Sequence, residues 1–365
     1  AGVGRKSGAT GPSMTPRLFS NRLLDWFAVH GRRDLPWQVR PTPYRVWVSE
    51  IMLQQTRVTT VIPYYQRFLS RFPTVKALAD ARLDEVLHHW SGLGYYARAR
   101  NLHRAACRIR DHHGGRFPRQ FDAVVELPGI GESTAGAILA LACGQRHAIL
   151  DGNVKRVLSR FHAVDGWPGQ TRVKRELWTL ADRYTPAARV SEYTQAIMDL
   201  GATLCTRTSP DCGSCPLQSD CAAFAAGRAA DYPQSRPRKD LPVRKTRLLL
   251  LSNSDKAVWL EQRPPAGIWG GLWSFPDLGQ DEDVSGWCRK RFGFPVLDIE
   301  SWPVVRHTFT HFHLDITPVV ARTGDCEAVM EGVEGVWYNT RSPDERGFAA
   351  PVQRLLERLQ QSAGH

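Results

Sequence analysis

The 365-residue chain is longer than a single hydrophobic core usually organises, so two domains are expected. Its 48 Lys and Arg outnumber 36 Asp and Glu, and the net charge of +12 suits a polyanionic partner such as nucleic acid, although many basic proteins bind none. No apolar run approaches the roughly 20 residues of a membrane span, and the first residues lack the apolar segment of a secretion signal, which excludes the membrane and secreted classes. We expect a water-soluble protein whose residues 1–16 form a disordered tail or a cloning remnant, with Met14 as the natural start.

Residues 17–221 are predicted to form an all-α domain. Apolar residues recur at helical spacing in Leu18–Ala28, Val46–Arg71, Leu83–Trp90, Arg98–His112 and Ser133–Cys143. Residues 222–246 are predicted to be a linker, because they are basic, contain three prolines and show no apolar periodicity.

Residues 247–365 are predicted to form an α+β domain. Strands are expected at Arg247–Leu251, Ala257–Leu260, Trp302–Val305, Phe312–Val320 and Gly335–Tyr338. Helical segments are expected near Trp287 and at Val352–Leu359.

Glu50 is the single acid of the segment Val46–Thr56, and apolar residues flank it on both sides. An isolated helical Glu is usually a solvated surface charge. Here partial burial would raise its pKa and keep a fraction of it protonated near neutrality, as a general acid requires.

The segment Gly92–Asn101 combines the adjacent Tyr95 and Tyr96 with Arg98 and Arg100. A wedge that stacks on bases, with arginines on phosphates, is one interpretation. Core tyrosines beside a solvated arginine face is the other, and the local sequence does not separate them.

Leu127–Gly131, followed by an apolar helix from Ser133, has the form of a helix-hairpin-helix motif. Gly129 and Gly131 allow a tight turn whose N–H groups, with the positive end of the next helix, would hold a DNA phosphate. A plain helix–helix turn is the alternative, and the nearby cysteine loop argues against it.

Asp151 precedes a helical run and is predicted to be its N-cap. A cap also fixes a carboxylate whose backbone donors keep it ionised, so the same residue could stabilise a positively charged sugar.

Cys205, Cys212, Cys215 and Cys221 lie within 17 residues in the pattern C-x6-C-x2-C-x5-C. Four thiolates so close together favour one soft-metal site over disulfides. Structural zinc is the alternative, but zinc ribbons usually pair two short Cys-x-x-Cys hooks and only one short gap exists here. The spacing resembles the [4Fe-4S] loop of the endonuclease III superfamily.

From about Leu23 to the C-terminus the chain resembles the adenine DNA glycosylases of the MutY family. The resemblance rests on motifs in the family's order: Asp34–Trp37, Met52–Thr56 after Glu50, Gly92–Tyr96, Leu127–Gly131, Asp151–Asn153, the four cysteines and Arg306–His311. It implies an all-α glycosylase core with a [4Fe-4S] cluster loop, followed by a Nudix-like C-terminal domain.

The resemblance also implies a role for each matching residue. Glu50 falls on the acid that protonates adenine, Asp151 on the carboxylate that supports the sugar cation, and Asn153 on its helper. The remaining matches are DNA or substrate contacts: Arg32 and Gln195 near the extruded adenine, Gln55 and Tyr95 in the base stack, Gly129, Gly131 and Ser133 at the hairpin, and Arg306, His307, Phe309, Thr310 and His311 at the lesion. The cluster ligands are the four cysteines.

The implied reaction is hydrolysis of the N-glycosidic bond of a flipped adenine that was mispaired with 8-oxoguanine or guanine in duplex DNA. A protonated acid assists the leaving base and an ionised carboxylate meets the sugar cation. The implied protein is a monomer of the bacterial type, cytoplasmic and associated with the nucleoid.

Two departures from motifs are visible in the second domain. After Gly270–Pro276 only Asp277, Asp281, Glu282 and Asp283 follow, without the run of glutamates that binds magnesium in a Nudix hydrolase, so pyrophosphatase activity is not expected. The lesion loop has Thr310 where the family commonly has Ser. Threonine keeps a hydroxyl and a backbone N–H, so the contact is expected to be retained with an additional methyl group beside it.

Two other functions are compatible with parts of the sequence. An endonuclease III-type glycosylase/lyase for oxidised pyrimidines would need an amine nucleophile, and a Lys is expected at the position of Ser133. A non-catalytic lesion-binding protein would lack Glu50 or Asp151, and both are present.

Overall fold

The computed structural model describes residues 13–236, 240–324 and 334–362, and these form two compact units. The first unit comprises Ala1–Ala79 and Arg104–Arg238, and the second comprises Asp80–His103 and Lys239–His365. Within the described residues, no helix is long and apolar enough to cross a membrane.

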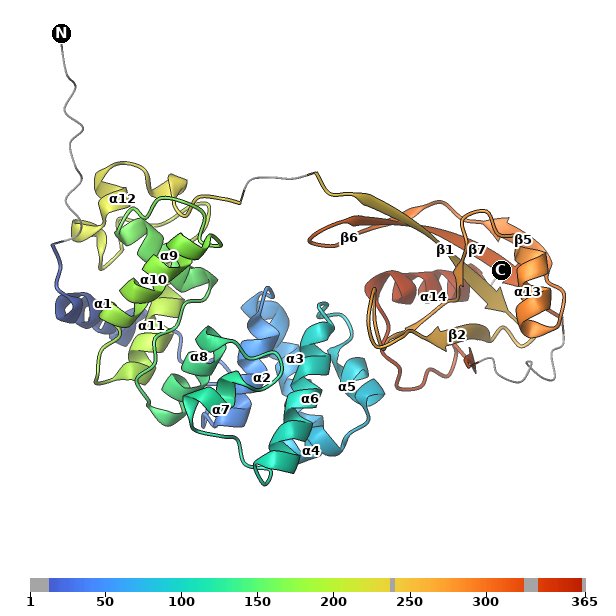
Figure 1. Cartoon of the computed structure of the whole chain (residues 1–365), viewed down its shortest axis with the longest axis horizontal. Coiled ribbons are helices and arrows are strands. Elements are labelled where there is room, and N and C mark those ends of the chain that lie inside the picture. The colour runs from blue at the N-terminus through green and yellow to red at the C-terminus, as the bar shows by residue number, and fades with distance from the viewer. Residues whose placement is uncertain (1–12, 237–239, 325–333, 363–365) are drawn as a thin grey trace, which may run out of the picture. The chain divides into compact units, whose positions relative to one another are not determined.

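The first unit is helical (Figure 1). Its elements are α1 (Pro16–His30), α2 (Pro43–Leu53), α3 (Val58–Arg71), α4 (Val75–Asp80), the C-terminal half of α6 (Ala97–His112), α7 (Phe121–Val125), α8 (Glu132–Cys143), α9 (Gly152–Phe161), α10 (Thr171–Tyr184), α11 (Val190–Thr203) and α12 (Ala222–Ala225), with short 3-10 turns at Gln218–Asp220 and Ala229–Asp231. The segment Val46–Arg71, expected to be one helical stretch, is divided into α2 and α3 because Gln55 adopts a left-handed backbone with φ +59°.

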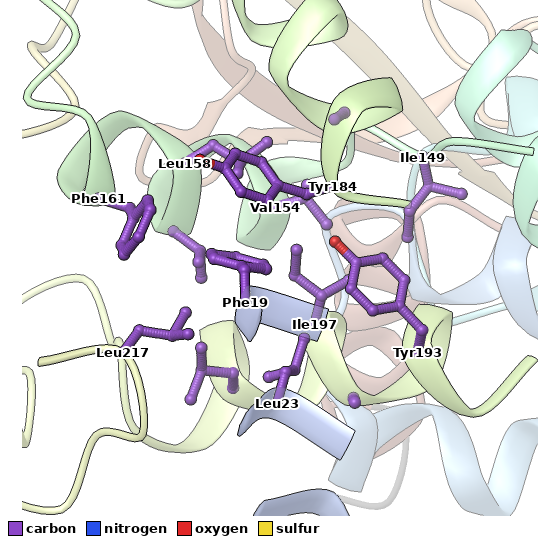
Figure 2. Packing of buried hydrophobic residues seen from close by; sticks show 14 of the residues in the cluster. Phe19, Leu23, Ile149, Val154, Leu158, Phe161, Tyr184, Tyr193, Ile197 and Leu217 are labelled. Atoms are coloured by element: carbon purple, nitrogen blue, oxygen red, sulfur yellow. The ribbon is translucent and has the colours of Figure 1, made fainter. Parts of the chain in front are cut away.

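A core of aromatic and aliphatic side chains holds α1, α9, α10 and α11 together (Figure 2). Phe19 and Leu23 from α1 meet Leu158 and Phe161 from α9, and the Phe19 and Tyr184 rings lie 4.3 Å apart. Leu217, from the cysteine loop, belongs to the same core. Burial of these side chains fixes both the start of α9 and the cysteine loop to one framework.

The second unit contains an eight-stranded mixed sheet (Figure 1). Its strands are β1 (Val243–Ser252), β2 (Val258–Gln262), β3 (Trp273–Ser274), β4 (Asp277–Leu278), β5 (Leu297–Ser301), β6 (Val305–Thr308), β7 (His313–Arg322) and β8 (Val336–Tyr338), in the order β3-β2-β1-β7-β5, with β4 paired to β1, β6 to β7 and β8 to β2. The central strands β1 and β7 pair in parallel from Val243↔His313 to Ser252↔Arg322.

Helices complete the second unit. Residues Leu249 and Leu251 on one face of β1 form a core with Cys288 and Phe292 of α13 (Val284–Phe292). Leu248 and Leu250 point to the opposite face and are also buried, so both faces of the sheet are covered. The last helix, α14 (Ala350–Ser362), runs beside the sheet in Figure 1.

The compact units divide the chain differently from the predicted domain boundaries. Residues 80–103, which include α5 (Leu83–Trp90), belong to the unit of the C-terminal sheet. The segment predicted as a linker begins with α12 and contributes Tyr232, which is 3% exposed, while β1 begins at Val243 before the predicted boundary. The predicted strand at Trp302–Val305 shares only Val305 with β6, and residues 1–12 lie outside the described part.

Candidate active site and DNA-contacting surfaces

Helix α2 positions Glu50. The helix begins with Pro43, and the Thr42 side chain accepts a hydrogen bond from the Arg45 N–H at 3.2 Å, so both residues favour a helix start at this point. The neighbouring Trp47, Val48 and Ile51 are buried. Burial of the Glu50 carboxyl, and secondly the negative charge of Asp151, raise its pKa to about 8. Glu50 therefore holds a proton at neutral pH and lies close enough to Asp151 to respond to its charge.

Asp151 is the N-cap of α9, as the sequence predicted. Its Oδ1 accepts a hydrogen bond from the Val154 N–H at 2.7 Å. Burial raises the pKa of this carboxyl, whereas the N–H groups of Val154 and Asn153 and the charges of Arg156 and Lys155 oppose that rise. The residue before it is also fixed, because the Leu150 N–H donates to the Ser133 hydroxyl of α8 at 2.9 Å.

Asn153 lies in the first turn of α9, where α11 passes very close. A Cβ added to Gly201 of α11 would stand 2.6 Å from the Asn153 Cβ, so this approach needs glycine. The Asn153 Oδ1 accepts a hydrogen bond from Arg156 Nη2 at 2.7 Å. Arg156 Nε also donates to the Cys205 carbonyl oxygen at 2.7 Å, which links the start of α9 to the cysteine loop.

Arg32 and Gln195 share one buried partner, Asp199 of α11. The Asp199 carboxylate, whose side chain is 1% exposed, accepts hydrogen bonds from the Arg32 N–H and Nε at 2.9 and 3.0 Å and from Gln195 Nε2 at 2.9 Å. A cavity of about 250 Å³ is lined by Arg32, Gln195 and Val46, among others. Val46 lies four residues before Glu50 on α2, although Glu50 itself does not line this cavity.

Asp199 was missed by the sequence reasoning. Its spacing of four from Gln195 would place the two on one helix face, but its pairing with Arg32 spans 167 residues and leaves no local pattern.

The four cysteines surround one small cavity of about 30 Å³. Burial raises the pKa of Cys215 to about 12 and also raises those of Cys212 and Cys221, and the neighbouring thiols act in the same direction. Within the described residues, no three His, Cys, Asp or Glu side chains are arranged to hold a single metal ion. The fit of a metal group to this loop therefore rests on the cavity that the four thiols share.

The buried Arg160 of α9 binds backbone carbonyl groups of the cysteine loop and of the segment after it. It is 3% exposed and donates to the carbonyl oxygens of Tyr232, Thr206 and Arg207 at 2.9, 2.7 and 3.1 Å. Its Nη1 also lies 3.3 Å from Cys205 Sγ, so a donor is aimed at one of the thiols.

The hairpin between α7 and α8 has the geometry expected of a phosphate-binding turn. Gly129 has φ +80°, and Gly131 is the N-cap of α8 without a side-chain cap. The first N–H groups of α8 are thus left for an external acceptor at the positive end of the helix. The predicted contact Ser133 already uses its hydroxyl to accept the Leu150 N–H.

Gln55 and Tyr95, the residues predicted to enter the base stack, share an unusual backbone. Both are exposed, and they have φ +59° and +50°. A positive φ is unfavourable for residues with a Cβ and is found where a loop must present a side chain. Tyr95 is 47% exposed, and the Arg98 guanidinium lies 5.4 Å from its ring centre.

The predicted lesion residues form the hairpin between β6 and β7. Thr310 and His311 are exposed at its tip, and the Phe309 N–H donates to the Phe312 carbonyl oxygen at 2.9 Å. Phe309 stacks on Phe312 with ring centres 4.5 Å apart, and His307 lies edge-on to it at 4.7 Å. Arg306 is paired across the strands with Asp315 through two hydrogen bonds of 2.6 and 2.8 Å.

Three of the four acidic residues that follow Gly270–Pro276 have structural partners. Asp277 pairs with Arg263 at 2.9 Å, Glu282 accepts from the Gly279 N–H at 3.0 Å, and Asp283 caps α13 through the Gly286 N–H at 2.7 Å.

Comparisons with known proteins agree with this architecture. The family "HhH-GPD superfamily base excision DNA repair protein" matches residues 48–183, and the family "NUDIX domain" matches residues 247–358. A solved thermostable thymine-DNA glycosylase, 26% identical, covers 58% of this chain and 97% of its own with a TM-score of 0.51. A structure of a non-covalent endonuclease III–DNA complex, 22% identical with a TM-score of 0.50, covers 59% and 98% and shares the fold.

Fold and motifs thus define a base-excision DNA repair glycosylase that carries a C-terminal NUDIX domain, which confirms the predicted fold class. The adenine DNA glycosylase of Buchnera aphidicola subsp. Acyrthosiphon pisum is 38% identical over 350 residues, covering 96% of this chain and 99% of its own. That of Mus musculus is 35% identical over 358 residues, covering 81% and 69%. The chain belongs to the adenine DNA glycosylase family and is a hydrolase that acts on N-glycosyl bonds.

Proposed function

We propose that the chain removes adenine opposite 8-oxoguanine or guanine by general-acid hydrolysis, with Glu50 as the acid and Asp151 as the anion. The observation that carries this proposal is the pair itself: one carboxyl whose pKa is raised to about 8 beside another that is held by backbone donors. The protonated Glu50 gives its proton to the leaving adenine, and Asp151 stabilises the positive charge on the sugar. Water then adds to the sugar, and the enzyme is regenerated when Glu50 regains a proton.

Arg32 and Gln195 bind the extruded adenine in this proposal. Asp199 holds the Arg32 guanidinium and the Gln195 amide beside the cavity of about 250 Å³, which is large enough for a purine base. A bound base would be fixed by groups that are already oriented, which lowers the cost of reaching the reactive geometry. Asn153 acts as a positioning residue through its bond to Arg156.

Duplex DNA is bound by the hairpin and by exposed loops in this proposal. Gly129 and Gly131 leave the N–H groups of α8 for a phosphate, and Gln55 and Tyr95 enter the base stack from strained exposed turns. The tip of the β6–β7 hairpin, with Phe309, Thr310 and His311, contacts the 8-oxoguanine. The protein would act as a monomer on chromosomal DNA.

A [4Fe-4S] cluster is the cofactor that the four cysteines fit. Cys205, Cys212, Cys215 and Cys221 would each supply one thiolate from the shared cavity, and Arg160 supplies a donor toward Cys205. When bound, such a cluster ties the cysteine segments together through iron–thiolate bonds. The bonds from Arg156 and Arg160 then hold the loop against α9, the helix that Asp151 caps.

The purified protein should therefore be brown, with about four irons per chain by metal analysis. A colourless, zinc-loaded and fully active preparation would contradict the cluster. Cys107, which lies outside the loop, provides the control: Cys107→Ser should keep the iron content, whereas Cys212→Ser should lower it.

The decisive experiment compares three duplexes, with A opposite 8-oxoguanine, A opposite G, and thymine glycol. Release of adenine from the first two and no action on the third is expected. In the same reactions borohydride should trap little Schiff-base adduct, because Ser133 provides no amine, and Ser133→Lys should increase trapping relative to Ser133→Ala. Efficient trapping by the unmodified chain, or excision of thymine glycol, would favour the endonuclease III-type alternative.

A further inference from the structure

The turn that carries Tyr95 is held by residues from the far end of the chain. The Tyr96 hydroxyl donates to the Phe348 carbonyl oxygen at 2.7 Å, and the Phe348 N–H donates to the Ser91 hydroxyl at 3.4 Å. One turn earlier in α5, His88 Nδ1 lies 3.2 Å from the Arg346 carbonyl oxygen. Backbone groups of Phe348 thus bond to both ends of the segment Ser91–Tyr96, and the Arg346 carbonyl oxygen bonds to the helix just before it.

Gly347, between these two residues, permits a close approach to α5. A Cβ at this position would stand 2.9 Å from the Leu87 Cβ and 3.0 Å from Leu272 Cδ2, so any side chain would push α5 away. Gly347 is in turn anchored to the sheet, since its carbonyl oxygen accepts the Trp273 N–H at 3.0 Å. The segment Arg346–Phe348 that holds the turn is therefore itself bonded to the sheet of the second unit.

The backbone of the turn Ser91–Tyr96 is unfavourable by itself. Gly92 and Gly94 have φ +98° and +71°, and Tyr95 has φ +50°, so the backbone includes two flexible residues and one strained residue. Within the turn, the Trp90 indole N–H and Arg98 Nη2 both donate to the Gly94 carbonyl oxygen, at 3.1 and 3.2 Å. These bonds fix the backbone before Tyr95, and the Tyr96 hydroxyl fixes it after Tyr95.

We propose that Gly347 and Phe348 form a positioning segment that holds the Ser91–Tyr96 turn so that the exposed Tyr95 is presented to the base stack. The C-terminal domain then contributes to extrusion of the adenine as well as to contact with the lesion. The proposal rests on the proposed role of Tyr95. A turn that is already ordered pays less conformational entropy when it enters DNA, which is the physical reason for such a support.

Two substitutions in the full-length chain test the support. Tyr96→Phe removes the hydroxyl that donates to the Phe348 carbonyl oxygen and accepts the Gly92 N–H at 3.4 Å, whereas Gly347→Ala leaves those two groups in place and inserts a methyl group against Leu87. The matched controls are Tyr232→Phe, which removes a tyrosine hydroxyl bonded to Asp165 at 3.2 Å, and Gly324→Ala, where a Cβ meets no atom of the described residues within 4 Å.

Hydrogen exchange of the free protein is the first measurement. Amides of residues 91–96 should exchange about five- to tenfold faster in Tyr96→Phe, which loses the bonds to Phe348 and Gly92, and about tenfold faster in Gly347→Ala, which disturbs only the contact from the far segment. The rest of the chain and both controls should keep the exchange of the unmodified protein. Unchanged exchange at 91–96 in both test variants would overturn the proposal.

The second measurement uses a duplex with 2-aminopurine beside the A:8-oxoguanine mispair, whose fluorescence rises when the stack opens. Both test variants should lower the amplitude of that rise and slow single-turnover excision about three- to tenfold, while the duplex Kd changes less than twofold. Tyr95→Ala should have a larger effect on fluorescence and leave Ser91–Tyr96 exchange unchanged. If Tyr95→Ala has no effect, the wedge role fails, and the exchange data still decide whether the support exists.

Discussion

The acid pair and the β6–β7 hairpin are built in opposite ways. Glu50 lies on α2 among buried side chains, and Asp151 caps α9, a helix of the buried core. Burial raises the pKa of both carboxyls, and backbone N–H groups oppose that rise at Asp151. Thr310 and His311 lie at an exposed hairpin tip, and the strands below the tip are held by the pairing of Arg306 with Asp315 and by the Phe309–Phe312 contacts. Proton transfer requires groups with a fixed geometry and pKa, whereas a surface that enters DNA must remain exposed until DNA covers it.

This difference predicts which substitutions stop the reaction and which change its specificity. Changes in the acid pair should remove activity on every adenine mispair alike. Changes at the hairpin tip should leave the reaction intact and alter the ratio between substrates.

The largest effect is expected for Glu50→Gln, which removes the transferable proton and changes little volume. Single-turnover adenine release should fall by about 10²–10⁴-fold, while the Kd for the duplex changes little. Glu176→Gln, on the exposed face of α10 where it pairs with Arg172, is the control and should retain normal turnover. Near-normal excision by Glu50→Gln would show that another group supplies the proton.

Asp151→Asn should have a similar or slightly smaller effect. Asparagine caps a helix as well as aspartate does, so α9 and the thermal stability should be almost unchanged while the anion is lost. Asp283→Asn makes the same change at the cap of α13 and should leave excision unaffected. If Asp151→Asn loses activity only in parallel with its Tm, the role of Asp151 is structural.

The surroundings of Glu50 and the cap position of Asp151 were predictable from the sequence, because their determinants are local. The apolar neighbours of Glu50 predicted its partial burial, which the structure shows, and the position of Asp151 before a helical run predicted the cap. The cysteine spacing likewise predicted that the four thiols would meet, and they line one cavity.

Features that depend on long-range contacts were not predictable. The pairing of Asp199 with Arg32 joins α11 to the loop after α1, and the support of the Ser91–Tyr96 turn by Phe348 joins residues more than two hundred positions apart. The break between α2 and α3 at Gln55 was missed for another reason. Its flanking sequence lacks Gly and Pro, so the strained φ is imposed by the fold rather than encoded by a turn residue.

At the hairpin tip, Phe309→Ala and His311→Ala should each reduce the preference for A opposite 8-oxoguanine over A opposite G. Base-specific contacts are typically worth ~1–3 kcal/mol, so a loss of about ten- to hundredfold in the ratio of single-turnover rates or affinities is the upper range. Val304→Ala, at an exposed position beside β6, is the control. An unchanged ratio in both variants would eliminate the lesion-contact role.

A chain that ends near Leu241 should lose the same preference, but this truncation is a less specific test. It also removes Phe348 and Gly347, which bond to or contact the segment 80–103. A weakening that is equal for both mispairs and depends on salt would indicate that the domain only adds positive surface. The two point variants separate these explanations because they leave the fold of the domain unchanged.

The smallest effect concerns pH. Since the Glu50 pKa is raised to about 8, adenine release by the enzyme should be independent of Glu50 ionisation below that value and fall about tenfold per pH unit well above it.

The raised pKa of Glu50 also affects the stability of the folded protein. Between the ordinary Glu pKa and about 8 the folded state binds more protons than the unfolded state, so the stability that Glu50 contributes is present at low pH and is lost as the pH rises through about 8. Glu50→Gln should therefore gain Tm relative to the unmodified chain as the pH increases from 5 to 8, by roughly 2–4 °C for each kcal/mol. Burial is the larger cause of the raised pKa, and the charge of Asp151 is the smaller one. Most of the gain in Tm should therefore remain when the double variant Glu50→Gln, Asp151→Asn is compared with the single variant Asp151→Asn. A Tm difference that does not change with pH in either background would mean that Glu50 is solvated, and the contrast between a partly buried acid pair and an exposed hairpin would not hold.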